Sequence, residues 1–398
     1  MKSWKELLSA NKERRAENIV FFFALLFVFL GYALFYRHYL PVSWDGGYHT
    51  LFAEKLFHES LQSMAKGDPN IPIWAITYPI YHLSLKLLAF LLGGRYYAAS
   101  YVILAFCVVL AILVYRILVY RFACPETRKE RVLCDILSIC SVVFLAACSP
   151  LTQWRFYARQ CGANPVHNPT ILFVRPLGLL AVLFFLLFLD QYEKKEKVLK
   201  SLLGFGIFSL LSVFAKPNFA FVFLPALALL TLCGMIHHKD IKLGIYAFLA
   251  ALPSAIAMLF QFTFVTDSTE AMHVVLSFGS FSEFTFLEVL AVSLATFPVP
   301  LILFSPKIFR KEMGCQVAYF ALVIGWIQMF LLTNGPSGDF SWGYDLAVQF
   351  STLAAIAYAA KYKMPVWRRG IAWGIFAYQT VCGLIYLVQV FLHAEILI

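Results

Sequence analysis

A short run after the first long apolar segment carries the residue types that acid–base chemistry uses. It reads Trp44-Asp45-Gly46-Gly47-Tyr48-His49. A carboxylate this close to a bilayer costs free energy unless it is solvated or paired, so such an acid is a functional candidate. Two glycines let the backbone turn sharply and leave room for a ligand. Asp45 is therefore the candidate general base. Alternatively, it caps a helix that begins near Tyr48.

Later segments between apolar runs add cations, amides and imidazoles, which suit a substrate that carries a phosphate. Breaking a bond to a phosphate leaving group requires positive charge nearby. Together with the first run, these segments supply the candidate substrate-binding residues Trp44, His49, Tyr78, Arg155, Arg159, His167, Asn168, Arg175, Lys216, Asp339 and Trp342.

Several of these candidates have a simpler interpretation. His167 and Asn168 could build the turn ahead of Pro169. Lys216 could be an interfacial anchor. Arg175 lies one turn into an apolar segment, so it either pairs with an acid such as Asp45 or Asp339 or binds phosphate.

Other polar side chains call for no substrate. Asp339 and Trp342 lie in a glycine-rich stretch where Asp is common anyway, and His49 could simply be solvated. We expect His82 and Lys86 to reach toward lipid headgroups.

The elements that hold these residues must be membrane-spanning helices. Of the 398 residues, 61% are hydrophobic and 14% are charged, whereas soluble domains carry about 25% charged residues. Many apolar runs reach the roughly 20 residues needed to cross the bilayer. The net charge of +10 falls in short loops between these runs, which sets orientation and predicts no nucleic-acid partner.

No resident cofactor or metal is predicted. The nine cysteines lie mostly inside apolar runs and form no CxxC pair, so neither a zinc site nor a disulfide framework is indicated. The sequence also contains no P-loop and no GxGxxG, so no soluble nucleotide site is visible.

We expect one all-α domain over residues 1–398, with a cytoplasmic N-terminus at 1–18 and a first outer loop at 38–95. Within that loop, residues 50–65 predict an amphipathic surface helix. The apolar stretch 71–92 is interfacial or re-entrant, because a crossing there would place the basic residues near Arg128 outside. Eleven spans remain, at about 19–37, 96–118, 132–149, 170–189, 200–215, 218–236, 243–264, 286–304, 315–333, 344–360 and 371–392.

This pattern resembles the GT-C glycosyltransferases, which include the lipid A aminoarabinose transferases and protein O-mannosyltransferases. The similarity rests on the first span, the outer Asp45, the amphipathic helix and the stretch Tyr78-Pro79-Ile80-Tyr81-His82-Leu83, and it covers about residues 19–190. The loops at 167–170 and 338–343 look like those of uncharacterised bacterial members. Many members carry two adjacent acids in the first loop, whereas Gly46 follows Asp45 here, which favours metal-independent catalysis.

The resemblance implies inverting transfer of a sugar from a polyprenyl-phosphate donor, with Asp45 as the base. The acceptor would be a glycan, a lipid or a protein at the outer face of the plasma membrane. Three alternatives remain open. They are a flippase or transporter for a lipid-linked glycan, a polysaccharide polymerase or ligase that moves a whole glycan block, and an inactive relative that acts as a scaffold.

Overall fold

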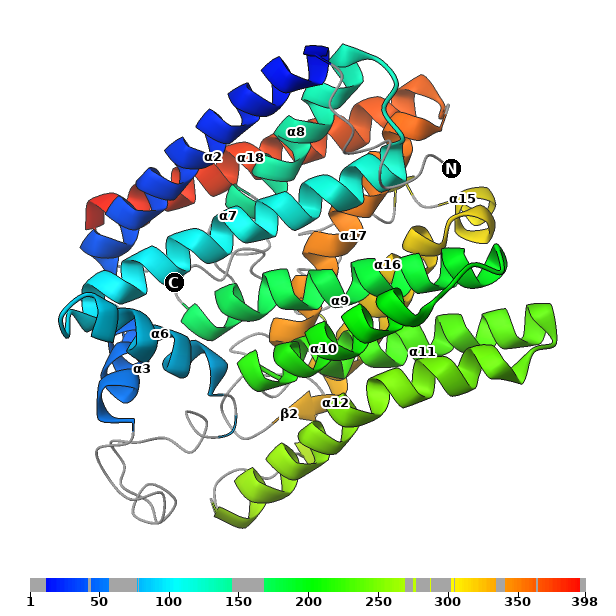
Figure 1. The fold of residues 1–398 in the computed structure, drawn as a ribbon. Helices are drawn as coiled ribbons and strands as arrows, with labels where there is room; N and C mark the ends of the chain where they lie inside the picture. The colour runs from blue at the N-terminus through cyan, green and yellow to red at the C-terminus, as the bar shows by residue number, and fades with distance from the viewer. Residues whose placement is uncertain are drawn as a thin grey trace.

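The computed structural model describes residues 12–41, 44–56, 77, 79–144, 168–268, 275–276, 287, 302–303, 305–333, 341–362 and 364–393, with Trp44 and Asp45 described by their backbone. Their helices form one bundle (Figure 1). The elements are α2 Lys12–Tyr39, α3 Trp44–Lys55, α6 Ile80–Leu91, α7 Tyr96–Ala123, α8 Arg128–Val143, α9 Pro169–Glu193, α10 Leu199–Ala215, α11 Asn218–His238, α12 Ile241–Ser268, β1 Val275–Leu276, α15 Pro306–Lys311, α16 Met313–Leu331, β2 Leu332–Thr333, α17 Ser341–Lys361 and α18 Val366–His393.

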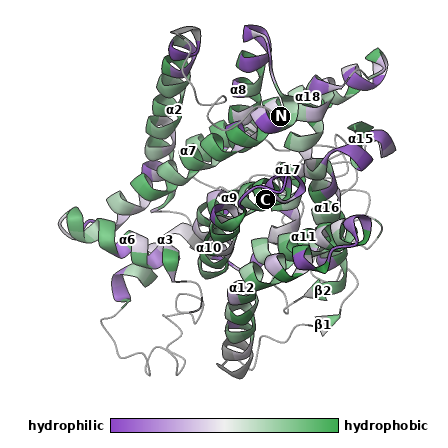
Figure 2. Cartoon of the chain, turned by 45° about the vertical axis from the view of Figure 1, so that its right-hand side comes forward, coloured by the Kyte–Doolittle hydropathy of each residue, from purple (hydrophilic) through white to green (hydrophobic). Residues whose placement is uncertain are grey.

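The expected all-α membrane architecture is confirmed. Apart from the two-residue antiparallel pairing of β1 with β2, the described elements are helices. Seven of them, α2, α7, α9, α11, α12, α16 and α18, are long and apolar enough to cross a membrane. Large apolar side chains such as Phe27 and Phe90 face outward, and Figure 2 shows hydrophobic residues along most of α2, α7 and α12. Such a surface requires a lipid environment.

The other four expected spans do not coincide with these seven helices. One falls on α10, whose 17 residues reach about 26 Å, short of the ~30 Å hydrocarbon core. Another, 132–149, falls on the 16-residue α8 and continues into residues 145–149, which lie outside the described part. A third falls on α17, a 21-residue helix buried along nearly its whole length. The fourth, 286–304, lies largely outside the described residues. The count of eleven therefore remains a prediction.

Residues 38–95, the expected first outer loop, contain two short helices, α3 and α6, that pack on each other and on α7 (Figure 1). In α3, Phe52 is buried while Glu54 is exposed, as the amphipathic pattern predicts, and Leu56, just after the helix, is also buried; residues 57–65 of that pattern lie outside the described part. The 12 residues of α6 extend about 18 Å. Because most of residues 71–79 lie outside the described part, the interpretation that the stretch 71–92 does not cross the bilayer remains a prediction.

The two ends of the bundle differ in chemistry. At one end, α2 finishes and α7 begins beside α3 and α6 (Figure 1). The other end, which we call the basic end, contains the charged residues around Arg128, Lys194, Lys239, Lys311 and Lys361. Ion pairs tie its helices together: Arg131 with Glu17 at 2.8 Å, Arg121 with Asp190, and Lys361 with Glu312. Basic residues at this end therefore join neighbouring helices through ion pairs.

Candidate functional site

The helix that carries the candidate base begins earlier than the sequence suggested. Because α3 starts at Trp44, Asp45 is its second residue and does not cap a helix beginning near Tyr48. The expected sharp turn at Gly46 and Gly47 is also wrong. Both lie inside α3, and the glycines with positive φ in the described residues are Gly93 and Gly94. Asp45 and His49 are therefore one helical turn apart on the same face of α3.

His49 forms a buried pair with His82 of α6. The distance from His49 Nδ1 to His82 Nε2 is 3.0 Å, so one ring donates to the other. The expectation that His82 reaches toward headgroups is wrong, since its side chain is fully buried. Lys86 likewise binds protein, donating to the carbonyl oxygens of Glu54 at 3.2 Å and of Leu56. The two helices thus form one unit, and His82 joins the candidate site.

The electrostatic surroundings keep His49 neutral. Burial lowers the pKa of its imidazole well below the usual value, and the nearby His82 and Lys216 lower it further. A neutral imidazole can donate one hydrogen bond and accept another. His49 therefore suits a hydrogen-bonding role better than a cationic one.

Lys216 lies in the tight turn between α10 and α11, as predicted. Helix α10 ends at Ala215, Lys216 is extended, and α11 begins at Asn218. The ammonium group lies 5.5 Å from the ring centroid of Trp342, near the start of α17. Both side chains are largely buried, so Lys216 is not an anchor exposed at the interface. The Gln261 amide donates to the carbonyl oxygens of Thr77 and Val213, so the last turn of α10 lies beside the start of α6, which packs on α3. We call this end of the bundle the site end.

Asn168 has the structural role that one interpretation predicted. Its side-chain oxygen accepts hydrogen bonds from the Ile171 backbone N–H at 3.1 Å and from the Thr170 hydroxyl at 2.8 Å. It is thus the N-cap of α9, with Pro169 at the first helical position, a combination that favours helix initiation. The cap fixes where α9 begins and so sets the depth of Arg175.

Arg175 is a buried cation whose hydrogen-bonding capacity is mostly unused. Only 2% of its surface is exposed. Its Nη1 donates to the Val142 carbonyl oxygen at 3.4 Å, whereas Nε and Nη2 have no hydrogen-bond partner in the part of the chain that the structure describes. The acid that attracts it is Asp345 of α17. The sequence had suggested Asp45 or Asp339 as its partner.

Asp345 begins a polar stripe on α17 that the sequence analysis missed. Asp345, Gln349 and Thr352 are buried, and their spacing of four and three residues places them on one helical face. Both carboxylate oxygens of Asp345 lack a hydrogen-bond partner among the described residues, as do Gln349 Oε1 and Thr352 Oγ1. An acid inside a largely apolar helix is itself a functional signal, and this signal could have identified Asp345.

The remaining candidates lie outside the residues that the structure describes. Tyr78, Arg155, Arg159, His167 and Asp339 fall in undescribed segments. Across the described residues, no three His, Cys, Asp or Glu side chains gather as a metal site.

Comparison with known proteins adds no relative. The sequence matches no protein-family model, and a search of curated proteins returns no match. What the site does must therefore be argued from its own residues.

Proposed function

We propose that this chain is a GT-C-type glycosyltransferase that moves one sugar from a polyprenyl-phosphate donor to an acceptor hydroxyl. The observation that carries the proposal is Arg175, a buried guanidinium with two nitrogens, Nε and Nη2, left without a hydrogen-bond partner in the described structure. Leaving such donors unsatisfied away from water costs free energy. A phosphate oxygen pairs well with the planar guanidinium. A phosphate of the donor would therefore satisfy Arg175.

The proposed reaction assigns each group one task. Asp45 takes the proton from the acceptor hydroxyl, whose oxygen attacks the anomeric carbon from the side opposite the phosphate. The bond from that carbon to the phosphate oxygen breaks, and its electron pair leaves with the phosphate. The configuration at the anomeric carbon is thereby inverted. Arg175 and Lys216 stabilise the charge that develops on the leaving phosphate.

The neighbouring residues position these groups. His49 lies one helical turn after Asp45 and, being neutral and held by His82, can orient the carboxylate without competing for the phosphate. Trp342 keeps the ammonium group of Lys216 against its ring. We assign Trp44, Tyr78, Arg155, Arg159, His167 and Asp339 to the same donor and acceptor sites.

The finer topology belongs to this proposal. We infer eleven spans, a cytoplasmic N-terminus and a site end on the outer face of the plasma membrane. This assignment is supported by the separation of charge, because the basic loops lie at the end opposite α3, and cytoplasmic loops carry excess Lys and Arg. A donor anchored by its polyprenyl tail would then present its phosphate at the outer interface, level with Lys216.

The polar stripe on α17 favours a second candidate, a flippase or transporter for a lipid-linked glycan, which would need a polar path through the bundle. From Asp345 to Thr352 the stripe rises about 10 Å, a third of the ~30 Å hydrocarbon core. A path of that length reaches a buried site without crossing the membrane. The enzyme is therefore the better supported of the two.

A transfer assay tests the proposal. Purified full-length protein in detergent receives a panel of radiolabelled polyprenyl-phosphate monosaccharides with wild type, Asp45→Asn and Glu54→Gln in parallel. Glu54 is exposed on the same helix, so its variant is the matched control. We expect wild type and Glu54→Gln to release carrier phosphate, and Asp45→Asn to be at least ~100-fold slower.

Two outcomes would contradict the enzyme proposal. Full activity of Asp45→Asn would remove Asp45 as the base. Equal inactivity of all three proteins across the panel would favour the transporter, the block-transferring polymerase or the scaffold.

A further inference from the structure

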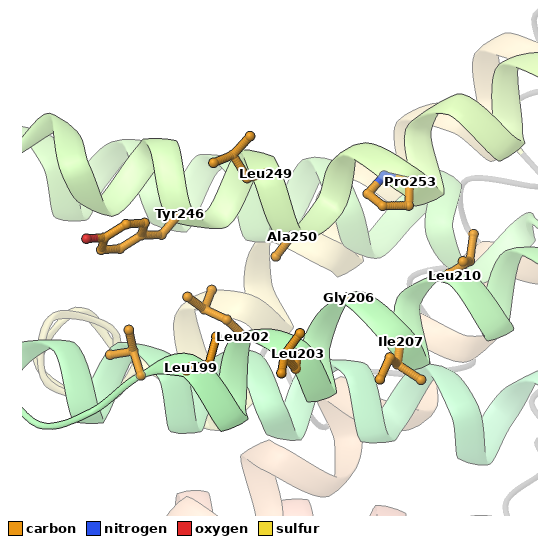
Figure 3. A pocket seen from close by; sticks show the side chains of 11 residues that line it. Leu199, Leu202, Leu203, Gly206, Ile207, Leu210, Tyr246, Leu249, Ala250 and Pro253 are labelled. Atoms are coloured by element: carbon orange, nitrogen blue, oxygen red, sulfur yellow. The ribbon is translucent and has the colours of Figure 1, made fainter.

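A long apolar groove runs between α10 and α12, away from the site end. It encloses about 580 Å³ and is lined by eleven residues, among them Leu203 and Ile207 of α10 and Leu249 and Pro253 of α12 (Figure 3). Ligand sites usually occupy ~300–1,000 Å³ and are mainly apolar. The groove is therefore large enough for a hydrocarbon chain, and Tyr246 is the one lining residue with a polar side chain.

The groove is a fixed feature, because the two helices are already in contact beneath it. A Cβ added to Gly206 would lie 2.9 Å from the carbonyl oxygen of Ala250, so the backbones approach closely at that point. The hydroxyl of Ser254 also donates to the hydroxyl of Ser209 at 2.8 Å. Since the helices cannot move closer, the furrow between their outward side chains remains open.

One mouth of the groove is strongly basic. Tyr246 lies at this mouth, and its hydroxyl points away from the apolar lining (Figure 3). Lys242 precedes Tyr246 by one turn on the same face of α12, and Lys197 and Lys200 flank the start of α10; all three lysines are exposed. Residues 193–200 and 237–242 together contain six lysines against three acids. A tyrosine beside lysines is typical of a helix end at the membrane interface.

We propose that this groove binds an acyl chain of an anionic phospholipid, whose phosphate is held by Lys197, Lys200 and Lys242. The lipid belongs to the leaflet beside the basic end, which the distribution of charge assigns to the cytoplasm. From Val198 to Leu210 the lining extends about 18 Å, close to the ~15 Å of hydrocarbon in one leaflet. The groove thus matches one phospholipid chain in length and charge, independently of the proposed glycosyl transfer.

The lysines decide which lipid binds. An acyl chain gains little when it moves from other lipid tails to an apolar protein surface, because both surroundings are equally apolar. Preference must therefore come from the headgroup, and each surface lysine contributes about a fivefold preference for anionic lipid. The expected selectivity is for negative charge over chain type, and it weakens as salt concentration rises.

Photo-crosslinking tests this site. The full-length protein is reconstituted in vesicles that contain phosphatidylglycerol with a photoreactive acyl chain, or the matching phosphatidylcholine, and crosslinked peptides are mapped by mass spectrometry. We expect phosphatidylglycerol to label residues 199–210 and 246–253 at least tenfold more than phosphatidylcholine. The variant Lys197→Gln/Lys200→Gln/Lys242→Gln should lose this preference. Leu203→Trp, which fills the groove, should lose the labelling itself.

The control removes the same number of exposed charges elsewhere at the basic end. Lys307→Gln/Arg310→Gln/Lys311→Gln on α15 should leave the labelling of the groove unchanged. Equal labelling by the two lipids, or equal loss in the control variant, would overturn the proposal. Stronger labelling of the groove by a photoreactive polyprenyl phosphate than by phosphatidylglycerol would also overturn it, because the occupant would then be the carrier.

Discussion

Arg175 on α9 and Asp345 on α17 attract each other inside the bundle, but these two described residues do not form an ion pair. Two nitrogens of Arg175, Nε and Nη2, and both carboxylate oxygens of Asp345 have no hydrogen-bond partner in the described chain. A direct pair would have satisfied both side chains. The separation leaves Arg175 able to bind an anion and Asp345 able to accept a hydrogen bond from a hydroxyl group. A sugar phosphate carries both of these groups.

The first prediction concerns this pair. Arg175→Gln should leave Asp345 as a buried acid with no nearby cation, which is costly, so the unfolding temperature should fall. Adding Asp345→Asn should recover part of the loss, with a coupling of roughly 1–3 kcal/mol. Thermal unfolding of wild type, the two single variants and the double variant measures this coupling. Strictly additive losses would show that the two side chains do not interact.

The second prediction concerns pH. Burial lowers the pKa of His49, so the folded protein resists protonation there while the unfolded chain takes up a proton near pH 6.5. The stability is thus fully present above pH ~6.5 and falls as the pH is lowered, by up to about 1.4 kcal/mol per unit. His49→Gln should show a shallower decline in unfolding temperature between pH 7 and 5.

The control for this measurement is His237→Gln, on an exposed position of α11. It should keep the wild-type slope of unfolding temperature against pH. If His49→Gln also keeps that slope, His49 is protonated equally in the folded and unfolded chains.

The third prediction concerns the packing that positions Trp342. A Cβ on Gly343 would lie 2.8 Å from the Asn218 carbonyl oxygen and 2.6 Å from a methyl group of Val222. Gly343→Ala should therefore push α17 from α11, move Trp342 away from Lys216 and cost about 1–3 kcal/mol. Gly374→Ala on α18, where nothing lies within 4 Å, should leave stability unchanged or raised. Unchanged melting and transfer in Gly343→Ala would contradict this account.

The fourth prediction separates two roles of Asn168. As the N-cap of α9, it should tolerate Asp, whose oxygen accepts the same hydrogen bonds, whereas Asn168→Ala should cost about 1 kcal/mol. Thr127→Ala removes the N-cap of α8, far from the site, and should lower stability by a similar amount. Calorimetry of the three variants measures the cost. If Asn168→Asp keeps stability but loses transfer, the amide nitrogen has a separate role with substrate.

Much of the site end could be predicted from local patterns. The turn at Lys216 follows from a proline between two apolar runs, and the start of α9 at Pro169 follows from the Asn before a Pro. Both are decided within a few residues of chain. The two glycines after Asp45 misled the sequence analysis, because a glycine permits a turn without requiring one. Here both glycines adopt the helical conformation of α3.

The sequence by itself determined that this chain is an α-helical membrane protein, since long apolar runs can satisfy their backbone hydrogen bonds in lipid only as helices. It also determined which short segments carry polar chemistry. Tertiary structure alone decided that His82 is buried against His49 and that Asp345 and Arg175 are both buried inside the bundle. The physical reason is that a helix fixes which residues share a face, whereas the burial and charge of that face depend on helices distant in the sequence.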